Sequence, residues 1–507
     1  MLHHEFINSA KKNKNKLAIK DVHLDKSVNY KRCLIASLIL SEKIKKKYSQ
    51  DFIGIMIPTS LGCALTVIAT LMAGKVPVMI NYSTGAADNA EYAQRKCGFE
   101  TIITSKALLK KIRCRWVSGM VFIEDIMESI TKTDKLLATL KANLPAAILN
   151  KQVYHSSEDD LAVILFTSGS EKDPKAVGLS HKNIISNIQA AVEHVGLLPE
   201  DVFIGILPYF HVFGFNTNLF VPLLTGSSLV TYPNPLDYKK VTNIIKNENI
   251  TILIGTPSFL SGYIKQADVG DFKSLRLAIS GADKTPEWLF KEYKQKHDVI
   301  LLEGYGSTET SPIISINQPD NYKIGSIGKP LKNINVKIES VDSSELLSEE
   351  KVGKILVKGD SIFTGYFDDL EETSFRIRDG WYDTGDMGSL DKDGFLWHKG
   401  RLRRFVKIGG EMISLVNVES ILEKYLPDNV ECCVIEIPDT RKGSKIIAVT
   451  SENIDKIEIL KKLKNNLPNI ALPKNFVTME NLPKMGSGKI DFRTITEMVK
   501  NLSYHQQ

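Results

Sequence analysis

Cysteine is scarce in this sequence. Six cysteines occur in 507 residues, none of them in a C-x-x-C pair, and no histidines stand beside them at the spacing of metal ligands. This pattern excludes a disulfide framework and gives no support for a zinc site. We therefore expect reduced, mostly buried thiols in a cytoplasmic protein. The six are Cys33, Cys63, Cys97, Cys114, Cys432 and Cys433.

A strong charge of either sign is also lacking. The chain carries 65 Lys and Arg against 59 Asp and Glu, a formal net charge of +6, and only 12 of the basic residues are arginine. Surfaces that read bases favour the planar arginine fork, so we do not expect nucleic acid as a partner. The 43% of hydrophobic residues excludes intrinsic disorder and suits a globular protein of several domains.

We expect no signal peptide, and the sequence has no uninterrupted apolar run long enough to cross a membrane. Residues 52–74 carry no charge, but Pro58 divides them. We predict a buried strand at 53–57, a helix cap at Ser60 and a helix at 61–73. A strand, a turn and a helix in about twenty residues form half of an α/β unit.

A second uncharged stretch, residues 202–236, is rich in aromatic residues and is repeatedly broken by Pro and Gly. We predict a buried strand–loop–helix–strand, some of whose side chains line an apolar ligand cavity. Exposed aromatics of this stretch would also leave open a peripheral contact with a membrane, such as a bacterial inner membrane. No transmembrane segment is expected.

Short apolar runs alternate with helical patterns along most of the chain, for example at Leu161–Phe166. We predict an α/β protein with a large N-terminal domain of parallel and mixed sheets covered by helices. Short Gly-rich strands after Ile324 predict a small β-barrel-like section. We place the domain boundary after residue 400, with residues 401–507 forming a small, mobile α+β domain.

Small hydroxyl residues and a glycine follow the apolar run Leu161–Phe166. Backbone N–H groups and hydroxyls at such a strand end, just before a helical pattern, are suited to phosphate oxygens, and Lys175 adds a positive charge. An ordinary polar loop is the alternative. A Walker P-loop is excluded, because no G-x-x-x-x-G-K-[ST] occurs. The loop residues are Thr167, Ser168, Gly169 and Ser170.

Four further segments follow this loop in a fixed order. They are Gly304-Tyr305-Gly306-Ser307-Thr308-Glu309, Tyr382-Asp383-Thr384-Gly385-Asp386, Gly400-Arg401 with Lys407-Ile408-Gly409-Gly410, and Pro483-Lys484-Met485-Gly486-Ser487-Gly488-Lys489. In this order and at these separations, the five segments resemble the adenylate-forming superfamily of acyl- and aryl-CoA synthetases, peptide-synthetase adenylation domains and luciferases. The resemblance extends from about residue 5 to residue 498.

The resemblance implies ATP and Mg²⁺ as cofactors and assigns a role to each matching residue. The Thr167–Ser170 residues, Lys175 and Thr308 would contact phosphate, and Glu309 would hold Mg²⁺. Tyr305, whose sequence neighbours Gly304 and Gly306 belong to the same nucleotide-binding segment, would stack on adenine. The remaining roles are an adenine loop at Gly281, Ala282 and Asp283, ribose contacts from Asp386 and Arg401, a gate to the acyl site at His211, and Lys489 at the carboxylate and α-phosphate.

Two half-reactions follow from the resemblance. A carboxylate and ATP give an acyl-adenylate and pyrophosphate, and a thiol then displaces AMP to give a thioester. The C-terminal domain of such enzymes swings between the steps, so Lys489 would serve the first. The loop at 407–411, with Lys407, Gly409 and Gly410, would line the thiol tunnel in the second, with a hinge near Arg403.

The phosphate loop departs from the usual pattern of the superfamily. Glu171 and Lys172 stand where Thr and Gly are common, and Ala176 replaces a common Gly. Because Pro174 and Lys175 are retained, we still expect activity.

The acid is expected to be apolar. Amino-acid-activating relatives place an Asp where this chain has His211, and residues 202–236 contain no carboxylate to pair with an ammonium group. Several segments resemble bacterial acyl-[acyl-carrier-protein] synthetases, as in the synthetase half of bifunctional lysophospholipid acyltransferase/synthetases. No acyltransferase domain precedes the chain, so we expect a stand-alone synthetase. These segments are Phe166-Thr-Ser-Gly-Ser-Glu, Leu223-Leu-Thr-Gly, Tyr232-Pro-Asn-Pro-Leu-Asp-Tyr, Gly304-Tyr-Gly-Ser-Thr-Glu, Gly380-Trp-Tyr-Asp-Thr-Gly-Asp and Gly410-Glu-Met-Ile-Ser-Leu.

Three functions therefore remain open. The first is activation of a fatty acid onto acyl carrier protein, an acidic partner suited to the +4 net charge of residues 400–507 (17 Lys and Arg, 13 Asp and Glu). The second is the same chemistry with coenzyme A. The third is a non-catalytic, adenylate-binding relative.

Overall fold

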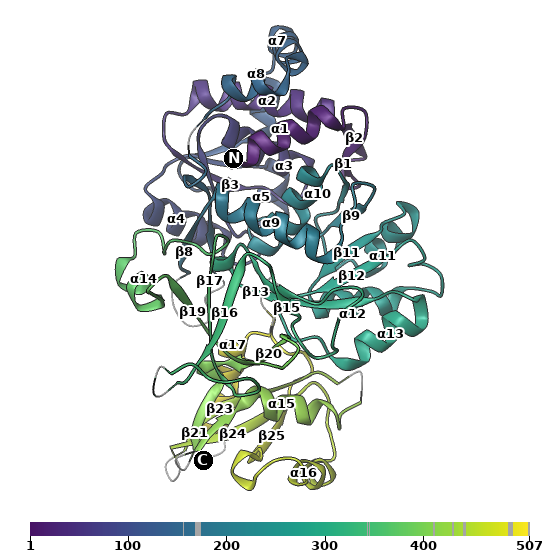
Figure 1. The fold of residues 1–507 in the computed structure, drawn as a ribbon, viewed down its shortest axis with the longest axis vertical. Helices are drawn as coiled ribbons and strands as arrows, with labels where there is room; N and C mark the ends of the chain where they lie inside the picture. Colours follow the sequence, from purple (N-terminus) through teal and green to yellow (C-terminus); the bar gives the residue numbers. More distant parts are fainter. Residues whose placement is uncertain are drawn as a thin grey trace. The chain divides into compact units, whose positions relative to one another are not determined.

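The computed structural model describes residues 1–155, 157–167, 174–341, 343, 345–408, 411–427, 430–439, 443–484 and 490–504 (Figure 1). The chain forms two compact units. Unit 1 comprises Met1–Ser168, Pro174–Asn335 and Lys358–Gly380, and unit 2 comprises Gly169–Asp173, Val336–Val357 and Trp381–Gln507. The sequence analysis places the start of a mobile domain after residue 400, and this boundary stays a prediction.

Unit 1 contains a six-stranded sheet in the order β6-β5-β3-β4-β7-β8, parallel except for the last pair. Its strands are β3 (Phe52–Met56), β4 (Val76–Met79), β5 (Ile102–Thr104), β6 (Met120–Phe122), β7 (Leu161–Phe166) and β8 (Ala176–Ser180). Associated helices are α2 (Tyr30–Lys47), α3 (Leu61–Met72), α4 (Ala86–Cys97), α5 (Lys106–Ile112), α6 (Ile123–Glu128), α7 (Lys132–Asn143), α8 (Ala146–Gln152) and α9 (His181–Val195).

A second sheet of unit 1 has nine strands in the order β15-β14-β13-β12-β11-β9-β10-β1-β2, of which the run from β13 to β1 is parallel. The strands are β1 (Leu17–Asp21), β2 (Lys26–Asn29), β9 (Val202–Gly205), β10 (Ser228–Thr231), β11 (Ile252–Gly255), β12 (Leu277–Ser280), β13 (Leu301–Gly306), β14 (Ile313–Ile316) and β15 (Lys329–Pro330). The other helices of unit 1 are α1 (Leu2–Lys12), α10 (Val221–Thr225), α11 (Tyr238–Asn247), α12 (Pro257–Gln266), α13 (Glu287–His297) and α14 (Leu370–Arg376).

Both uncharged stretches fold as predicted. The first gives β3, then a Ser60 cap whose Oγ accepts a hydrogen bond from the Cys63 N–H (3.2 Å), then α3. The second gives β9, a π-helix at Gly214–Phe220, α10 and β10. Most of its aromatic rings are buried, so the predicted membrane contact through exposed aromatics of this stretch is wrong. The buried rings are Phe203, Tyr209, Phe210, Phe215 and Phe220.

Unit 2 is built mostly on antiparallel strands, and its pair β24–β25 is parallel. In its first sheet β16 (Ile334–Glu339), β17 (Gly353–Gly359) and β19 (Trp381–Leu390) follow one another, and β20 (Leu396–Arg401) pairs with β19. A short hairpin joins β21 (Phe405–Ile408) to β22 (Glu411–Ser414). The last sheet has β24 (Gly443–Thr450) between β23 (Cys432–Asp439) and β25 (Asn475–Thr478).

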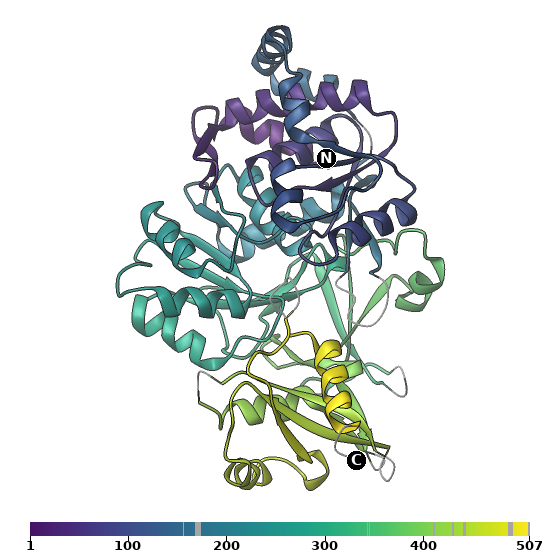
Figure 2. The ribbon, with the colours of Figure 1, turned by 180° about the vertical axis from the view of Figure 1, so that it is seen from behind.

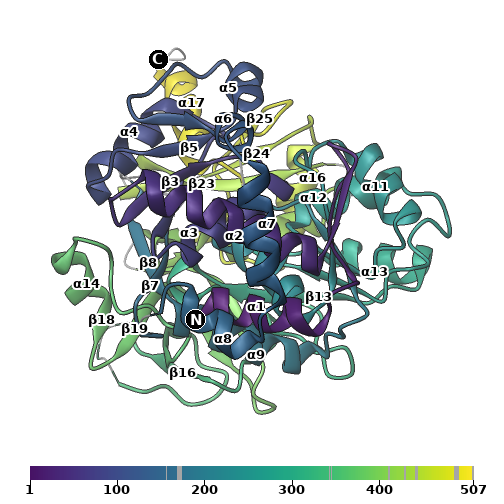
Figure 3. The ribbon, with the colours of Figure 1, turned by 90° about the horizontal axis from the view of Figure 1, so that it is seen from above.

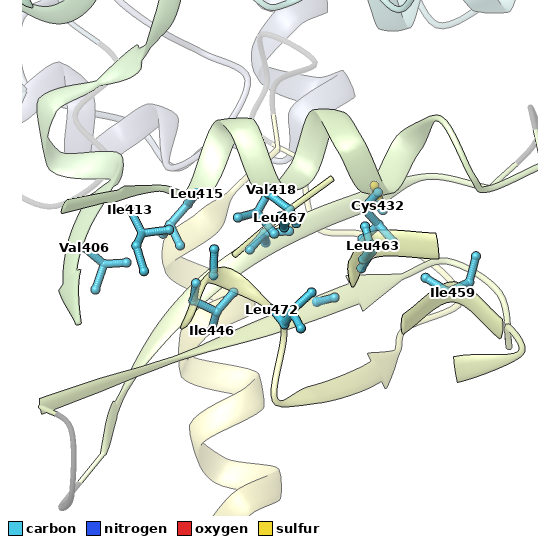
Figure 4. Close-up of a cluster of buried hydrophobic side chains, with 14 of the residues drawn as sticks. Val406, Ile413, Leu415, Val418, Cys432, Ile446, Ile459, Leu463, Leu467 and Leu472 are labelled. Carbon is cyan, nitrogen blue, oxygen red and sulfur yellow. The ribbon is translucent and has the colours of Figure 1, made fainter. Parts of the chain in front are cut away.

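Two apolar clusters hold the last sheet of unit 2 to its helices. One joins α15 (Leu415–Glu423) and α16 (Lys456–Lys464) to β23 and β24 (Figure 4). The other joins α17 (Phe492–Tyr504), the yellow helix of Figure 2, to β23 and β24. Among the labelled side chains of the first cluster are Val406, Ile413, Leu415, Val418, Cys432, Ile446, Ile459, Leu463, Leu467 and Leu472.

The six cysteines are free thiols, of which Cys114 is half-buried and the other five are buried. In the described part of the chain, no helix combines the length and apolar character that crossing a membrane requires.

Candidate active site

The carboxyl ends of two neighbouring parallel strands form the first part of the candidate site. Strand β12 ends at Ser280 and leads into the predicted adenine loop, while β13 ends at Gly306. The Glu303 carboxylate accepts a hydrogen bond from the Thr285 N–H (2.8 Å), which fastens the loop to β13. A Cβ at Gly281 would lie 3.5 Å from the Gly304 carbonyl oxygen. Gly281 and Gly304 are therefore side by side, whereas Ala282 and Asp283 are exposed.

Tyr305 and Thr308 lie on either side of a tight turn after β13. A Cβ at Gly306 would come within 1.7 Å of the Pro312 carbonyl oxygen, so only glycine allows this approach. The same oxygen accepts a hydrogen bond from the Ser307 N–H (3.0 Å). The following 3₁₀ turn, Thr308–Thr310, leaves Thr308 half-buried and buries Glu309.

Glu309 is only 7% exposed and is held at both its backbone and its side chain. Its carbonyl oxygen accepts from the Phe363 N–H (2.9 Å), and its Oε1 accepts from the Tyr366 hydroxyl (2.9 Å). No group of three His, Cys, Asp or Glu that could hold a metal occurs among the described residues. A single carboxylate nevertheless fits Mg²⁺, which binds through one or two carboxylates together with phosphates and water.

The predicted phosphate loop is closed by a hairpin. Strands β7 and β8 are antiparallel, the Thr167 N–H donates to the Lys175 carbonyl oxygen (3.0 Å), and the Lys175 N–H donates to the Thr167 hydroxyl (3.1 Å). Ser168, Gly169 and Ser170 lie outside the described residues. The expectation of a loop directly before a helix is wrong, because Ala176–Ser180 is a strand and α9 starts only after it.

The Lys175 side chain contacts two residues that the sequence did not suggest. Its Nζ forms an ion pair with Glu372 of α14 and lies 4.8 Å from the centre of the Tyr366 ring. The Arg376 guanidinium contacts the same carboxylate (Nε to Oε1, 3.1 Å). Burial alone would raise the pKa of Glu372, but hydrogen bonds from Lys175 and Arg376 outweigh it and lower that pKa.

Tyr366 therefore contacts both charged residues of the predicted phosphate site. Its hydroxyl donates to Glu309, and its ring lies beside the Lys175 ammonium. The sequence offers only a weak signal for it, since Tyr366 lies in the region of short Gly-rich strands predicted after Ile324. The contacts join residues far apart in the sequence, which no local pattern reveals.

His211 lies in the turn between β9 and the π-helix. Its N–H donates to the Pro208 carbonyl oxygen (3.1 Å), and its ring packs against Phe210 with centroids 4.7 Å apart. The same segment reaches the adenine loop, because a Cβ at Gly281 would lie 3.1 Å from the Phe213 ring. The structure thus brings the predicted acyl gate and the predicted adenine loop into one neighbourhood of unit 1.

Unit 2 brings together the two predicted ribose residues. Asp386 on β19 is the register partner of Arg401 on β20, and their side chains approach to 3.5 Å (Nε to Oδ1). Asp386 is buried, whereas the Arg401 side chain is mostly exposed. The backbones of Arg403 and Lys407 lie in a 3₁₀ turn, Leu402–Arg404, and in β21. Gly409, Gly410 and Lys489 lie outside the described residues.

Comparison with known proteins identifies the family. The chain matches the AMP-binding enzyme family over residues 6–367 and the C-terminal domain of AMP-binding enzymes over residues 417–489. It belongs to the AMP-binding enzyme family. It is an AMP-forming acid–thiol ligase, and enzymes of this kind use ATP and Mg²⁺.

Similar proteins support this assignment over most of the chain. An indoleacetate–CoA ligase of Aromatoleum aromaticum is 30% identical over 68% of this chain and 68% of its own length. A long-chain-fatty-acid–CoA ligase of Bacillus subtilis is 27% identical over 88% of this chain and 85% of its own. The fold matches ATP-bound MatB from Rhodopseudomonas palustris with a TM-score of 0.85 at 24% identity, covering 99% and 100% of the two chains. The predicted α/β fold class is confirmed.

Proposed function

We propose that this AMP-binding enzyme activates a fatty acid as its acyl-adenylate and transfers the acyl group to the phosphopantetheine thiol of acyl carrier protein. The observation that carries the adenylation step is the contact of Tyr366 with both Glu309 and Lys175. A buried carboxylate and an ammonium group linked by one rigid ring, close to the carboxyl end of β13, suit a nucleotide triphosphate and its metal.

The proposed ATP site lies at the carboxyl ends of β12 and β13. Tyr305 would stack on adenine beside Gly281, Ala282 and Asp283. The phosphates would meet Thr308, Lys175 and the loop with Thr167, Ser168, Gly169 and Ser170. Two hydrogen bonds between Thr167 and Lys175, one between backbones and one from the Lys175 N–H to the Thr167 hydroxyl, support this proposal, because they hold the two ends of the loop together.

Glu309 is the proposed Mg²⁺ ligand. One of its carboxylate oxygens accepts the Tyr366 hydroxyl, which orients the group while leaving further acceptor capacity. When bound, Mg²⁺ neutralises negative charge on the phosphates. Glu309 and Tyr366 would thus act as a ligand and its positioning residue.

The remaining roles that we propose belong to residues of unit 2. Asp386 would accept hydrogen bonds from the ribose hydroxyls with Arg401 beside it, and their proximity on paired strands supports this. Lys489 would screen the repulsion between the carboxylate and the α-phosphate. Residues 401–507 would move about a hinge near Arg403, which would bring Lys407, Gly409 and Gly410 to the thiol.

The proposed chemistry has two displacements. A carboxylate oxygen attacks the α-phosphorus of ATP, and the bond to the bridging oxygen of pyrophosphate breaks. The thiolate sulfur then attacks the acyl carbonyl carbon, and AMP leaves with the electron pair of the cleaved C–O bond. His211, at the turn before the π-helix, would separate the acyl pocket from the nucleotide.

A fatty acid is favoured over an amino acid because residues 202–236 provide no carboxylate. Two relatives, the Bacillus subtilis ligase and a medium-chain acyl-CoA ligase of Rattus norvegicus that is 27% identical over 92% of this chain, are named for fatty or medium-chain acids. Other relatives are named for aromatic acids such as indoleacetate and 4-coumarate. The pocket therefore has to be tested with both classes of acid.

Coenzyme A is the second candidate thiol. Acyl carrier protein is favoured by the basic excess of residues 400–507 and by the sequence segments that resemble acyl-[acyl-carrier-protein] synthetases. Coenzyme A is favoured by the names of the relatives, which are CoA ligases.

Two assays test the proposal. ATP–pyrophosphate exchange should depend on a fatty acid and Mg²⁺, and fatty acids should support a higher kcat/KM than indoleacetate or 4-coumarate. One labelled fatty acid is then offered with holo-acyl carrier protein, the apo form, or coenzyme A. Thioester on the holo form alone would support the proposal, and thioester on coenzyme A alone would establish the second candidate. Absence of exchange with every acid would indicate a non-catalytic adenylate-binding protein.

A further inference from the structure

Helix α7 presents large apolar side chains to solvent. Leu136, Leu137 and Leu140 are 61%, 54% and 57% exposed, whereas Ala138 and Ala142 of the same helix are buried. Figure 3 shows α7 lying over α2, and the two helices are in contact. The small residues of α7 therefore face the protein and its large apolar residues face outward, the reverse of the usual surface helix.

Helical geometry places these residues on opposite faces. At about 100° per residue, the three leucines fall within an arc of about 100° that is centred opposite the two alanines. Lys132 and Lys141 lie at the two edges of the leucine arc. An outward apolar face bordered by lysines is the pattern of a helix that lies in a membrane interface.

The charges around α7 favour an anionic surface. The carboxylates nearest to α7 already have cationic partners within the fold: Asp134 pairs with Lys43 (2.7 Å) and Glu42 with Lys141 (2.8 Å). The Lys43–Asp134 pair brings the last turn of α2 to the start of α7. Beyond these pairs, six exposed lysines of α2, α7 and the end of α8 have no ion-pair partner among the described residues. The six are Lys45, Lys46, Lys47, Lys132, Lys135 and Lys151.

We infer that the leucine face of α7, with the six exposed lysines of α2, α7 and α8, docks unit 1 onto the surface of an anionic lipid bilayer. The leucines would enter the boundary between headgroups and acyl chains, and the lysines would contact the headgroups. This surface differs from the buried aromatics of residues 202–236. The inference does not depend on which acid or thiol the enzyme uses, and it would bring the enzyme to the phase into which long-chain acids partition.

Vesicle flotation tests the docking surface. The full-length protein is mixed with vesicles of phosphatidylcholine alone or of phosphatidylcholine with phosphatidylglycerol. We expect flotation with the anionic vesicles, weaker binding at high salt, and at least about tenfold weaker binding of the double variant Leu136→Ser/Leu140→Ser. The matched control, Leu24→Ser/Val269→Ser, removes two exposed apolar side chains elsewhere in unit 1 and should float like the wild type.

The results of these measurements distinguish a membrane from other partners of the α7 surface. ATP–pyrophosphate exchange with a short, water-soluble acid should be equal in all three proteins and shows that the variants fold. Failure of the wild type to float, unchanged flotation of the Leu136/Leu140 variant, or equal binding to neutral vesicles would overturn the inference. A wild-type dimer in solution that the same double substitution dissociates, without flotation, would instead make α7 an interface between copies of the chain.

Discussion

Among single residues, Tyr366 has the most informative set of contacts. One end of the side chain donates a hydrogen bond to Glu309, and the face of its ring lies 4.8 Å from the Lys175 ammonium. The two charged residues come from segments about 130 positions apart, and Tyr366 comes from a third. Replacement of Tyr366 by Phe removes the hydroxyl and keeps the ring, so this substitution tests which of the two contacts matters for catalysis.

Tyr366→Phe should reduce ATP–pyrophosphate exchange about tenfold and raise the Mg²⁺ concentration needed for half of the maximal rate, because the Glu309 carboxylate loses its orienting donor. A Mg²⁺ titration of the exchange rate measures both effects. Tyr30→Phe is the matched control, since the Tyr30 hydroxyl donates to the Ser227 carbonyl oxygen (2.6 Å) in the buried interior. That variant should lose stability and keep the wild-type Mg²⁺ dependence. The same Mg²⁺ dependence in Tyr366→Phe would argue against a positioning role.

Between elements, the buried carboxylate of Asp201 connects the amino ends of three parallel strands. Asp201, just before β9, binds Arg276, just before β12, through two contacts (2.5 and 2.8 Å). It also accepts from the hydroxyl of Thr251, just before β11 (2.8 Å). Burial alone would raise the pKa of Asp201, but these partners and the Leu198 N–H lower it. The candidate site occupies the opposite, carboxyl ends of the same sheet.

Asp201→Asn should lower the free energy of unfolding by about 1–2 kcal/mol at neutral pH, because the buried side chain loses the charge that strengthens its hydrogen bonds from Arg276, Thr251 and the Leu198 N–H. A carboxylate whose pKa is lowered in the folded state contributes its full stability above the pKa of the unfolded chain. That contribution disappears as the pH falls through the lowered value. Denaturant unfolding of both proteins across acidic pH should show the difference shrinking, and a constant difference would contradict the assignment. The exposed pair Lys291–Glu287 supplies the control, because Glu287→Gln should change stability by less than about 1 kcal/mol.

Local signals in the sequence predicted many of the elements. Pro58 and Ser60 separate β3 from α3, and the apolar run Leu161–Phe166 is a strand with those bounds. The strand Ala176–Ser180 was missed because it is rich in small residues and directly precedes a helix. The sequence predicted a helix within residues 202–236 but not that Gly214–Phe220 is a π-helix. The wider turn of a π-helix gives the sequence no periodic pattern of its own.

Short motifs in the sequence predicted part of the candidate site. Thr308, Glu309 and the proposed ribose residues Asp386 and Arg401 are examples, and the structure brings Asp386 and Arg401 within 3.5 Å of each other. Tyr366 and Glu372 could not be found in this way, because their contacts to Glu309 and Lys175 depend on tertiary folding. The leucines of α7 show a further limit: periodicity reveals an apolar face, but burial of the opposite face decides whether it points inward or outward.

In the whole molecule, positive charge is unevenly distributed along the sequence. Residues 400–507 carry +4 of the total of +6. The catalytic lysine proposed for adenylation, Lys489, belongs to this segment, as do the residues proposed for the thiol step. The proposed division of the two half-reactions between two arrangements of the chain can be tested by the kinetics of single-residue variants.

Lys489→Ala should abolish formation of the acyl-adenylate and spare thioester formation from supplied acyl-adenylate, since only the first step brings a carboxylate against a phosphate anion. Pyrophosphate release with ATP and a fatty acid measures the first step. Thioester formation from synthetic acyl-adenylate measures the second. Equal loss of both activities would refute the division of labour.

The hairpin that closes the phosphate loop has a consequence for how this enzyme can be altered. Thr167 and Lys175 are joined by two hydrogen bonds that involve only a backbone and a hydroxyl, and β7 and β8 continue the pairing below them. We therefore expect the stem to keep its geometry when the side chains at positions 171 and 172 change. Substitution of Glu171 and Lys172, or exchange of the whole loop for that of a relative, should leave Thr167 and Lys175 in place.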